Sequence, residues 1–193
     1  MATKQSFPWA AATVALVGSA QSLENSDFGP AIDQHDLVFR INQGAFANLQ
    51  PHNTGLRTDY LLMTLTGGTN SAKWSFIRRG QRAAKKGVVL MSSKGRMLFR
   101  VDLTPFFLHY PASWHEELIV KLGHRPSTGA MAIDLLTRTM NDPEALDVYG
   151  FDFFKTPDIA HGRNNVVAHD PGVEEGYIRG LIPAHRFHES PQA

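Results

Sequence analysis

Two histidines in the last third of the chain have the side chain best suited to moving a proton near neutral pH. His169 ends the short run "NVVAH". Glu174 comes five residues later, in a stretch with helical character. His161 lies in the polar segment "DIAHGRNN". An imidazole titrates near pH ~6.5, so it can serve as a general base or acid. Either histidine could instead be an ordinary exposed or structural side chain, and the residues alone leave this open.

A possible anion site lies in the segment "RPSTGAMAIDLL". Ser127, Thr128 and Gly129 are predicted to form the first turn of a helix. Free backbone N–H groups and the positive end of the helix dipole favour a bound anion there. The alternative is a plain Ser/Thr cap without a ligand.

A second possible anion site is the turn that follows the apolar run "TVALV". Gly18 would let the backbone approach a phosphate closely, and the Ser19 hydroxyl could donate a hydrogen bond. In open α/β sheets, ligands bind beyond the carboxyl ends of strands, and this turn would lie at such an end. The alternative is an ordinary connection between a strand and a loop.

These segments need strands and helices to position them. Short apolar runs bounded by Gly, Asn, Asp or Pro predict buried strands at "TVALV", "DLVFRI", "DYLLMTL", "GVVLM", "LDVYGF" and "NVVAH". Helical patterns lie between them, over 70–87, over 113–123 with Ser113 as N-cap, and over 127–142. This alternation predicts one α/β domain with a mostly parallel sheet and helices on both faces.

Composition narrows the class of protein. The chain has 193 residues, no cysteine and a formal net charge of +1, so neither a disulfide framework nor a thiol nucleophile exists, and bulk charge indicates no partner. The apolar stretch from Ala10 to Val17 is far shorter than the ~20 residues that span a bilayer. We therefore expect a cytoplasmic protein without a membrane span. No G-x-S-x-G elbow and no H-E-x-x-H metal motif occurs.

One part of the chain is strongly basic. No acidic residue lies between Asp59 and Asp102, a region that contains Lys73, Arg78, Arg79, Arg82, Lys85, Lys86, Lys94, Arg96 and Arg100. This pattern is typical of a solvated helix face, and the alternative is a surface that attracts an anionic substrate. Because Trp74, Phe76 and Phe99 fit the core pattern, stacking on nucleic acid is not expected.

Taken in order, four segments resemble the sialyl motifs of the eukaryotic-type sialyltransferases, glycosyltransferase family 29. "VALVGSAQSLENSDFGPAIDQHDLVFRIN" is similar to the large motif, and the agreement is best at Ile32, Asp33, His35, Asp36, Val38, Arg40 and Asn42. "RPSTGAMAIDLLTRTMNDPEALDVYGFDF" resembles the small motif, "DIAHGRNN" the third and "HDPGVE" the very small motif. Two features depart from the family. The Gly-Asn-Ser turn is Gly18-Ser19-Ala20 here, and the cysteines that link the large and small motifs are replaced by Val14 and Pro143.

The resemblance implies a metal-independent, inverting glycosyltransferase with a GT-A-like, Rossmann-type sheet. The donor would be a CMP-linked 2-keto sugar acid such as sialic acid, the acceptor a glycan or glycolipid hydroxyl, and no cofactor would be needed. His169 would be the general base, His161 would stabilise the leaving phosphate, and Glu174 would support His169. The resemblance assigns donor binding to Gly18, Ser19, Asn42, Ser127, Thr128 and Gly129.

Two other functions remain open. CMP-Kdo could be the donor, because Kdo shares the 2-keto carboxylate of sialic acid. The chain could also be a non-catalytic nucleotide- or glycan-binding protein. We expect an N-terminal extension over 1–12, the CMP-sugar-binding domain over 13–182 and a loose tail over 183–193. Peripheral association with a membrane is compatible with a glycolipid acceptor.

Overall fold

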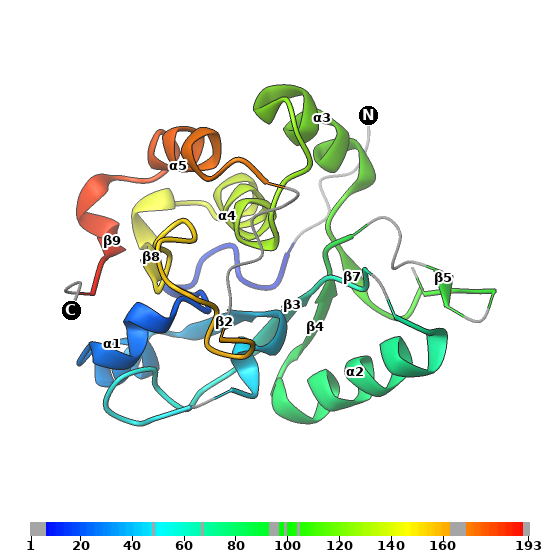
Figure 1. The fold of residues 1–193 in the computed structure, drawn as a ribbon, viewed down its shortest axis with the longest axis horizontal. Coiled ribbons are helices and arrows are strands. Elements are labelled where there is room, and N and C mark those ends of the chain that lie inside the picture. The colour runs from blue at the N-terminus through cyan, green and yellow to red at the C-terminus, as the bar shows by residue number, and fades with distance from the viewer. Residues whose placement is uncertain are drawn as a thin grey trace.

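A seven-stranded sheet, in which all neighbouring strands are parallel, forms the centre of the protein (Figure 1). The computed structural model describes residues 7–47, 49–66, 68–92, 97–98, 100–103, 105–162 and 169–190. The strands are ordered β7, β4, β3, β2, β1, β8, β9 across the sheet. Their bounds are β1 Val14–Val17, β2 Leu37–Ile41, β3 Tyr60–Met63, β4 Gly87–Leu90, β7 Leu108–His109, β8 Leu146–Tyr149 and β9 Phe187–His188. A separate antiparallel pair consists of β5 (Met97–Leu98) and β6 (Val101–Asp102).

The direction in which strands are added to the sheet changes at β1. The chain first places β2, β3, β4 and β7 on one side of β1, and then places β8 and β9 on the other. Ligands of open parallel sheets bind outside the carboxyl ends of the strands at such a point. The predicted turn at Gly18 and Ser19 directly follows β1 and so lies at this position.

Helices cover both faces of the sheet, which confirms the predicted fold class. In Figure 1, one face carries α3 (Ala112–Leu122), α4 (Thr128–Thr139) and α5 (Pro171–Arg179), and the other carries α1 (Gly29–Gln34) and α2 (Asn70–Ala83). Alternate side chains of β1 enter different clusters, with Val14 and Leu16 in the larger one and Ala15 and Val17 in another. Burial on both faces explains why these strands are continuous apolar runs in the sequence.

Two helices differ from their predicted bounds. α2 ends at Ala83 rather than continuing to Gly87, because the amides of Lys85 and Lys86 donate to the carbonyls of Thr58 and Asp59 instead of to the helix. α3 begins at Ala112, and its N-cap is Pro111 rather than Ser113. Pro111 has φ −59° and ψ 139°, outside the helical region, and its carbonyl accepts the first helical bond from the amide of His115. The predicted strand "NVVAH" falls mostly on residues 163–168, outside the described residues.

Both ends of the described chain are part of the domain. Phe187–His188 form β9 beside β8, after a 3-10 helix at Ala184–Arg186, so the prediction of a loose tail from residue 183 is wrong there. Trp9, predicted to lie in an extension, is fully buried. Its indole donates to the Thr139 hydroxyl at 2.8 Å, and its ring packs edge-on against Phe39. Apolar side chains outside the predicted domain therefore complete its core.

The basic segment is mainly a solvated helix face. Arg78, Arg79 and Arg82 lie exposed on α2. Trp74 is 39% exposed and so does not belong to the core as predicted, whereas Phe76 packs against buried residues. Phe99, Lys94 and Arg96 lie outside the described residues. No helix in the described part of the chain has the length and apolar character needed to span a membrane.

Most residues that carry the resemblance to the large motif hold the backbone in place. The buried Arg40 guanidinium donates to the carbonyls of Arg57 and Thr54, at 2.9 and 2.7 Å. Asp33 accepts from the amides of Leu56 and Arg57. These bonds join α1 and β2 to the loop that leads into β3.

His35 belongs to a cluster around Asp147 at the beginning of β8. Asp147 accepts hydrogen bonds from His188 at 2.6 Å, His35 at 3.1 Å and Arg186 at 3.1 Å. Burial opposes ionisation of Asp147, but the bonds from His188 and His35 and the charge of Arg186 outweigh it and lower its pKa. Burial likewise disfavours the His35 cation, yet the Asp147 bond and charge raise the pKa of His35 above its ordinary value. This cluster attaches β9 to β8.

The raised pKa of His35 predicts a loss of stability at alkaline pH. The contribution of His35 is complete below its unfolded pKa of ~6.5 and is lost as the pH rises through its folded pKa. We expect His35→Gln to cost about 1 kcal/mol at pH ~6, because a charge-assisted hydrogen bond becomes a neutral one. The free energy of urea unfolding should then fall less between pH ~6 and ~8 in His35→Gln than in the wild type. The control is the exposed His52→Gln, and equal pH slopes in both variants would remove His35 from this role.

Candidate active site

A cleft of about 320 Å³ lies at the carboxyl ends of β1, β2, β3 and β8, beside the beginning of α4. Every residue that the sequence predicted for the site lines it: Gly18, Ser19, Asn42, Ser127, Thr128, Gly129, His161, His169 and Glu174. Segments far apart in the sequence therefore meet where the sheet topology places a ligand. The role of each residue stays a prediction.

Gly18 has a packing requirement of its own. A Cβ atom at residue 18 would lie 2.2 Å from the carbonyl oxygen of Gly150, in the turn after β8. The Gly18 amide donates to the Tyr149 carbonyl at 2.8 Å, which draws the two turns together. Close approach of protein backbone, rather than of a phosphate, is enough to explain the glycine.

The Ser19 side chain holds the loop that carries His161. Its hydroxyl donates to one carboxylate oxygen of Asp158 at 2.5 Å, and the other oxygen accepts from the amide of Ala160 at 2.8 Å. The Ser19 carbonyl accepts from the amide of Ile159 at 2.8 Å. Sequence reasoning missed Asp158, because nothing in "PDIAH" shows which distant turn its carboxylate contacts.

Asn42 joins three elements at the floor of the cleft. Its amide nitrogen donates to the Thr128 hydroxyl at 3.0 Å. Its carbonyl oxygen accepts from the amide and the hydroxyl of Thr64, at 2.9 and 3.0 Å. Asn42 itself has φ 44°, in the left-handed region that asparagine tolerates better than most residues. Thr64, which follows β3, is a second residue of the cleft that the sequence did not indicate.

The N-terminus of α4 is held from two sides. Ser127 is the N-cap, and its hydroxyl accepts from the amide of Ala130 at 3.0 Å. Glu174, only 1% exposed, accepts from the amide of Ser127 at 2.7 Å. Glu174, predicted to support His169, is thus hydrogen-bonded to Ser127. Its carboxylate also lies 3.9 Å from Nδ1 of His169.

The orientation of His169 is set by a backbone carbonyl. Its Nδ1 lies 2.9 Å from the oxygen of Arg125, which can only accept, so Nδ1 carries the proton. Nε2 is then left with its lone pair, which is the state that a general base requires. The ring also stacks on Phe154, with centroids 5.9 Å apart and planes at 13°.

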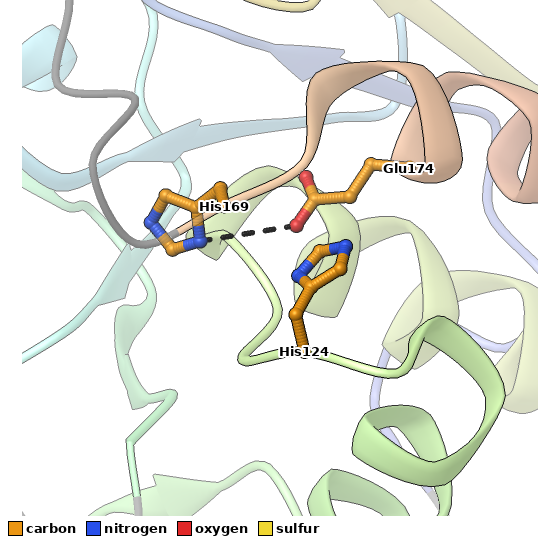
Figure 2. A group of neighbouring side chains, drawn as sticks. All are labelled: His124, His169 and Glu174. Atoms are coloured by element: carbon orange, nitrogen blue, oxygen red, sulfur yellow. Dashed lines mark ion pairs between the residues drawn. The ribbon is translucent and has the colours of Figure 1, made fainter.

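A third imidazole lies beside His169 and Glu174. Figure 2 shows His124 close to both side chains, and one ligand atom from each of the three residues lies within 4.8 Å of the others. His124 Nδ1 also donates to the Arg125 carbonyl, at 3.0 Å. The predicted absence of a metal site rested on spacing motifs, which cannot detect ligands from three separate segments.

The cleft is polar but has little positive charge from side chains. Among the lysines and arginines in the described ranges, only Arg125 lines it. Arg78, Arg79 and Arg82 of α2 are not among the lining residues. Neutralisation of an anionic ligand therefore depends on the helix N-terminus, the histidines and Arg125.

Comparison with known proteins relates this arrangement to a family. A family model described as Glycosyltransferase family 29 (sialyltransferase) matches residues 4–101, about half of the 193 residues. The chain belongs to this family. The small, third and very small motifs lie beyond the matched range, in the half of the chain that supplies both histidines.

Relatives of known name agree with this membership. The rice (Oryza sativa subsp. japonica) sialyltransferase-like protein 5 is 26% identical over 140 residues, which are 72% of this chain and 27% of the rice protein. The chain therefore spans about a quarter of the length of that curated relative.

Solved structures show that the fold is that of sialyltransferases. A mammalian sialyltransferase matches with a TM-score of 0.62 and 16% identity, over 94% of this chain and 70% of the other. A mammalian sialyltransferase in complex with Gal-beta-1-3GalNAc-ortho-nitrophenol matches at 0.57 and 18% identity, over 92% and 69%. The Campylobacter jejuni sialyltransferase CstII, in complex with the substrate analogue cytidine 5'-monophosphate, matches at 0.56 and 12% identity, over 92% and 84%.

Two glycines test the packing account of the cleft. We expect Gly18→Ala to destabilise the protein by about 3 kcal/mol, because its methyl group would overlap the Gly150 carbonyl. Gly176→Ala is the matched control, since a Cβ at that position in α5 meets nothing within 4 Å. It should stabilise the protein by about 0.5–1 kcal/mol through helix propensity. Urea unfolding measures both changes, and equal stability of Gly18→Ala and wild type would contradict the account.

Two neighbouring glutamates test the support of α4. Glu174→Ala leaves the buried Ser127 amide without its acceptor, and we expect a cost of about 2 kcal/mol in the free energy of unfolding. Glu174→Gln retains an acceptor oxygen and should recover much of this loss. Glu175→Ala removes only partly exposed pairs with Lys155 and Arg179, so it should cost about 0.5 kcal/mol. Similar costs for the two alanine variants would refute a special role for Glu174.

Proposed function

We propose that this chain transfers a 2-keto sugar acid, sialic acid, from its CMP donor to a glycan or glycolipid hydroxyl, with inversion and without a metal ion. The observation that carries the proposal is the state of His169. The Arg125 carbonyl fixes its proton on Nδ1, and the ring lines a cleft that also contains a helix N-terminus. Family membership and the sialyltransferase fold support the same chemistry.

His169 acts on the acceptor in this mechanism. Nε2 takes the proton of the attacking hydroxyl while the bond between the anomeric carbon and the CMP phosphate breaks on the opposite face. Proton transfer of this kind contributes typically ~10²–10⁴-fold to the rate. Stacking on Phe154 keeps the ring oriented, so the base does not have to be ordered at each turnover.

The beginning of α4 receives the leaving phosphate. The amides of Ala130 and Ser127 are already bonded, to the Ser127 hydroxyl and to Glu174. Within the described contacts, those of Thr128 and Gly129 have no protein partner and can donate to phosphate oxygens. His161 adds a donor from the facing loop. Such fixed donors stabilise developing negative charge without reorganising during the reaction.

Ser19 and Asn42 have different parts in donor binding. Because the Ser19 hydroxyl donates to Asp158, we expect it to shape the turn around the donor rather than to donate to phosphate. Asn42 uses both ends of its amide to fix Thr64 and Thr128, so it holds the floor on which the nucleotide lies.

The donor assay and one variant test the proposal together. Incubation with CMP-sialic acid or CMP-Kdo in the presence of EDTA should release CMP, and the donor that is cleaved identifies the sugar. We expect His169→Ala to lower turnover by about 10²-fold or more while CMP affinity changes little. The matched control is His185→Ala. The His185 side chain is 67% exposed and does not line the cleft.

Three results would revise the proposal. Turnover close to wild type in His169→Ala would exclude this histidine as the base. A requirement for added metal would contradict stabilisation of the phosphate by protein donors. Binding of CMP with neither donor cleaved would favour the non-catalytic nucleotide-binding function.

A further inference from the structure

We propose that His124, His169 and Glu174 form a regulatory site for a zinc-class divalent cation. The transfer reaction itself does not require this cation. The three side chains come from the segment after α3, the second residue before α5 and the first turn of α5. They converge as Figure 2 shows, with one ligand atom of each within 4.8 Å of the others. None of the motifs that carry the family resemblance includes His124.

The spacing of these atoms suits a small ion. Two ligands at ~2.0–2.1 Å from a tetrahedral Zn²⁺ are about 3.3 Å apart. His169 Nδ1 and the nearer Glu174 oxygen are 3.9 Å apart, so a contraction of roughly 0.6 Å would bring them to coordination distance. Because the Ser127 amide holds the Glu174 carboxylate, rotation of His169 supplies this shift, and it breaks the hydrogen bond from Nδ1 to the Arg125 carbonyl.

A buried atom without a partner points independently to a ligand. His124 Nε2 is inaccessible to solvent and has no hydrogen-bond partner among the described residues. Its Nδ1 donates to the Arg125 carbonyl, which leaves the lone pair on Nε2. Burying this acceptor unsatisfied is costly, and coordination to a cation would satisfy it.

The charge at the site also favours a cation. Glu174 is almost fully buried, and in the described structure its ion-pair partner is His169 alone, with no lysine or arginine. One of its oxygens accepts from the Ser127 amide, which fixes the carboxylate in place. The carboxylate is therefore a preorganised ligand beside the two imidazoles.

The ligand types select the metal. Two imidazole nitrogens and one carboxylate are a set that binds Zn²⁺ and leaves a fourth position for water. Mg²⁺ prefers oxygen ligands in octahedral geometry and would bind poorly. No protein ligand besides these three residues is needed for this assignment.

Occupation of the site would switch off the base. A metal on Nδ1 of His169 takes the position of the Nδ1 proton, and the neutral ring then carries its proton on Nε2. Nε2 has no lone pair in this state and cannot accept a proton from a hydroxyl. This inhibitory consequence rests on the proposed function, whereas metal binding itself does not.

Isothermal titration of the EDTA-treated, dialysed full chain with Zn²⁺ tests the site directly. We expect one Zn²⁺ per chain, with affinity lowered at least about tenfold in His124→Ala and in His124→Gln. His185→Ala is the matched control and should bind like the wild type, and Mg²⁺ should give no comparable heat. Absence of Zn²⁺ binding to the wild type, or equal affinity in both folded His124 variants, would overturn the proposal.

A kinetic measurement tests the regulatory consequence. His124 does not line the cleft, so His124→Ala should keep basal CMP release. Zn²⁺ should inhibit the wild type, reversibly with EDTA, and inhibit His124→Ala only at a concentration about tenfold or more higher. Inhibition at the same concentration in both proteins would overturn the regulatory role. If titration shows the site but neither donor is ever cleaved, the metal site stands and the proposed function fails.

Discussion

The contact between the Glu174 carboxylate and the Ser127 amide is the bond on which the cleft depends. It connects α5 to the N-terminus of α4 at 2.7 Å and is buried from solvent. Among the described contacts, the His169 bond to the Arg125 carbonyl and the Tyr177 bond to Asp134 join the same two parts of the chain. Because a carboxylate accepts strongly and a helix N-terminus attracts negative charge, the bond fits both partners. Glu174 therefore links the beginning of α4 directly to α5, the helix that follows His169.

The motif residues divide into two groups once the structure is known. Arg40, Asp33 and His35 hold loops and strands through hydrogen bonds away from the cleft. Of the seven positions that agree best with the large motif, only Asn42 lines the cleft. A resemblance in sequence therefore indicates both a shared scaffold and a shared site, and geometry is needed to separate them. Ser19, in the turn after β1, is bonded through its hydroxyl to Asp158, 139 residues away in the sequence.

Short apolar runs predicted five of the seven strands of the sheet, and a helix cap together with the family resemblance indicated the residues that line the cleft. A buried parallel strand is a continuous apolar run, and the Ser127 cap marks the beginning of α4. Features that depend on distant partners could not be predicted. The requirement for Gly18 comes from the Gly150 carbonyl, and the place of β9 in the sheet comes from its pairing with β8. His124 lies beside His169 and Glu174 only because segments far apart in the sequence meet there, and no spacing rule encodes such a meeting.

His124 and His169 share one hydrogen-bond acceptor, the backbone carbonyl of Arg125. The backbone and the side chain of this residue therefore have separate effects. The carbonyl sets the tautomers of His124 and His169, while the Arg125 side chain is exposed and contributes charge at the mouth of the cleft. Pro126 restricts residue 125 to extended conformations whatever its side chain, so the carbonyl keeps its direction. Substitution of the Arg125 side chain should therefore change the charge beside the cleft and leave in place the carbonyl that orients His124 and His169.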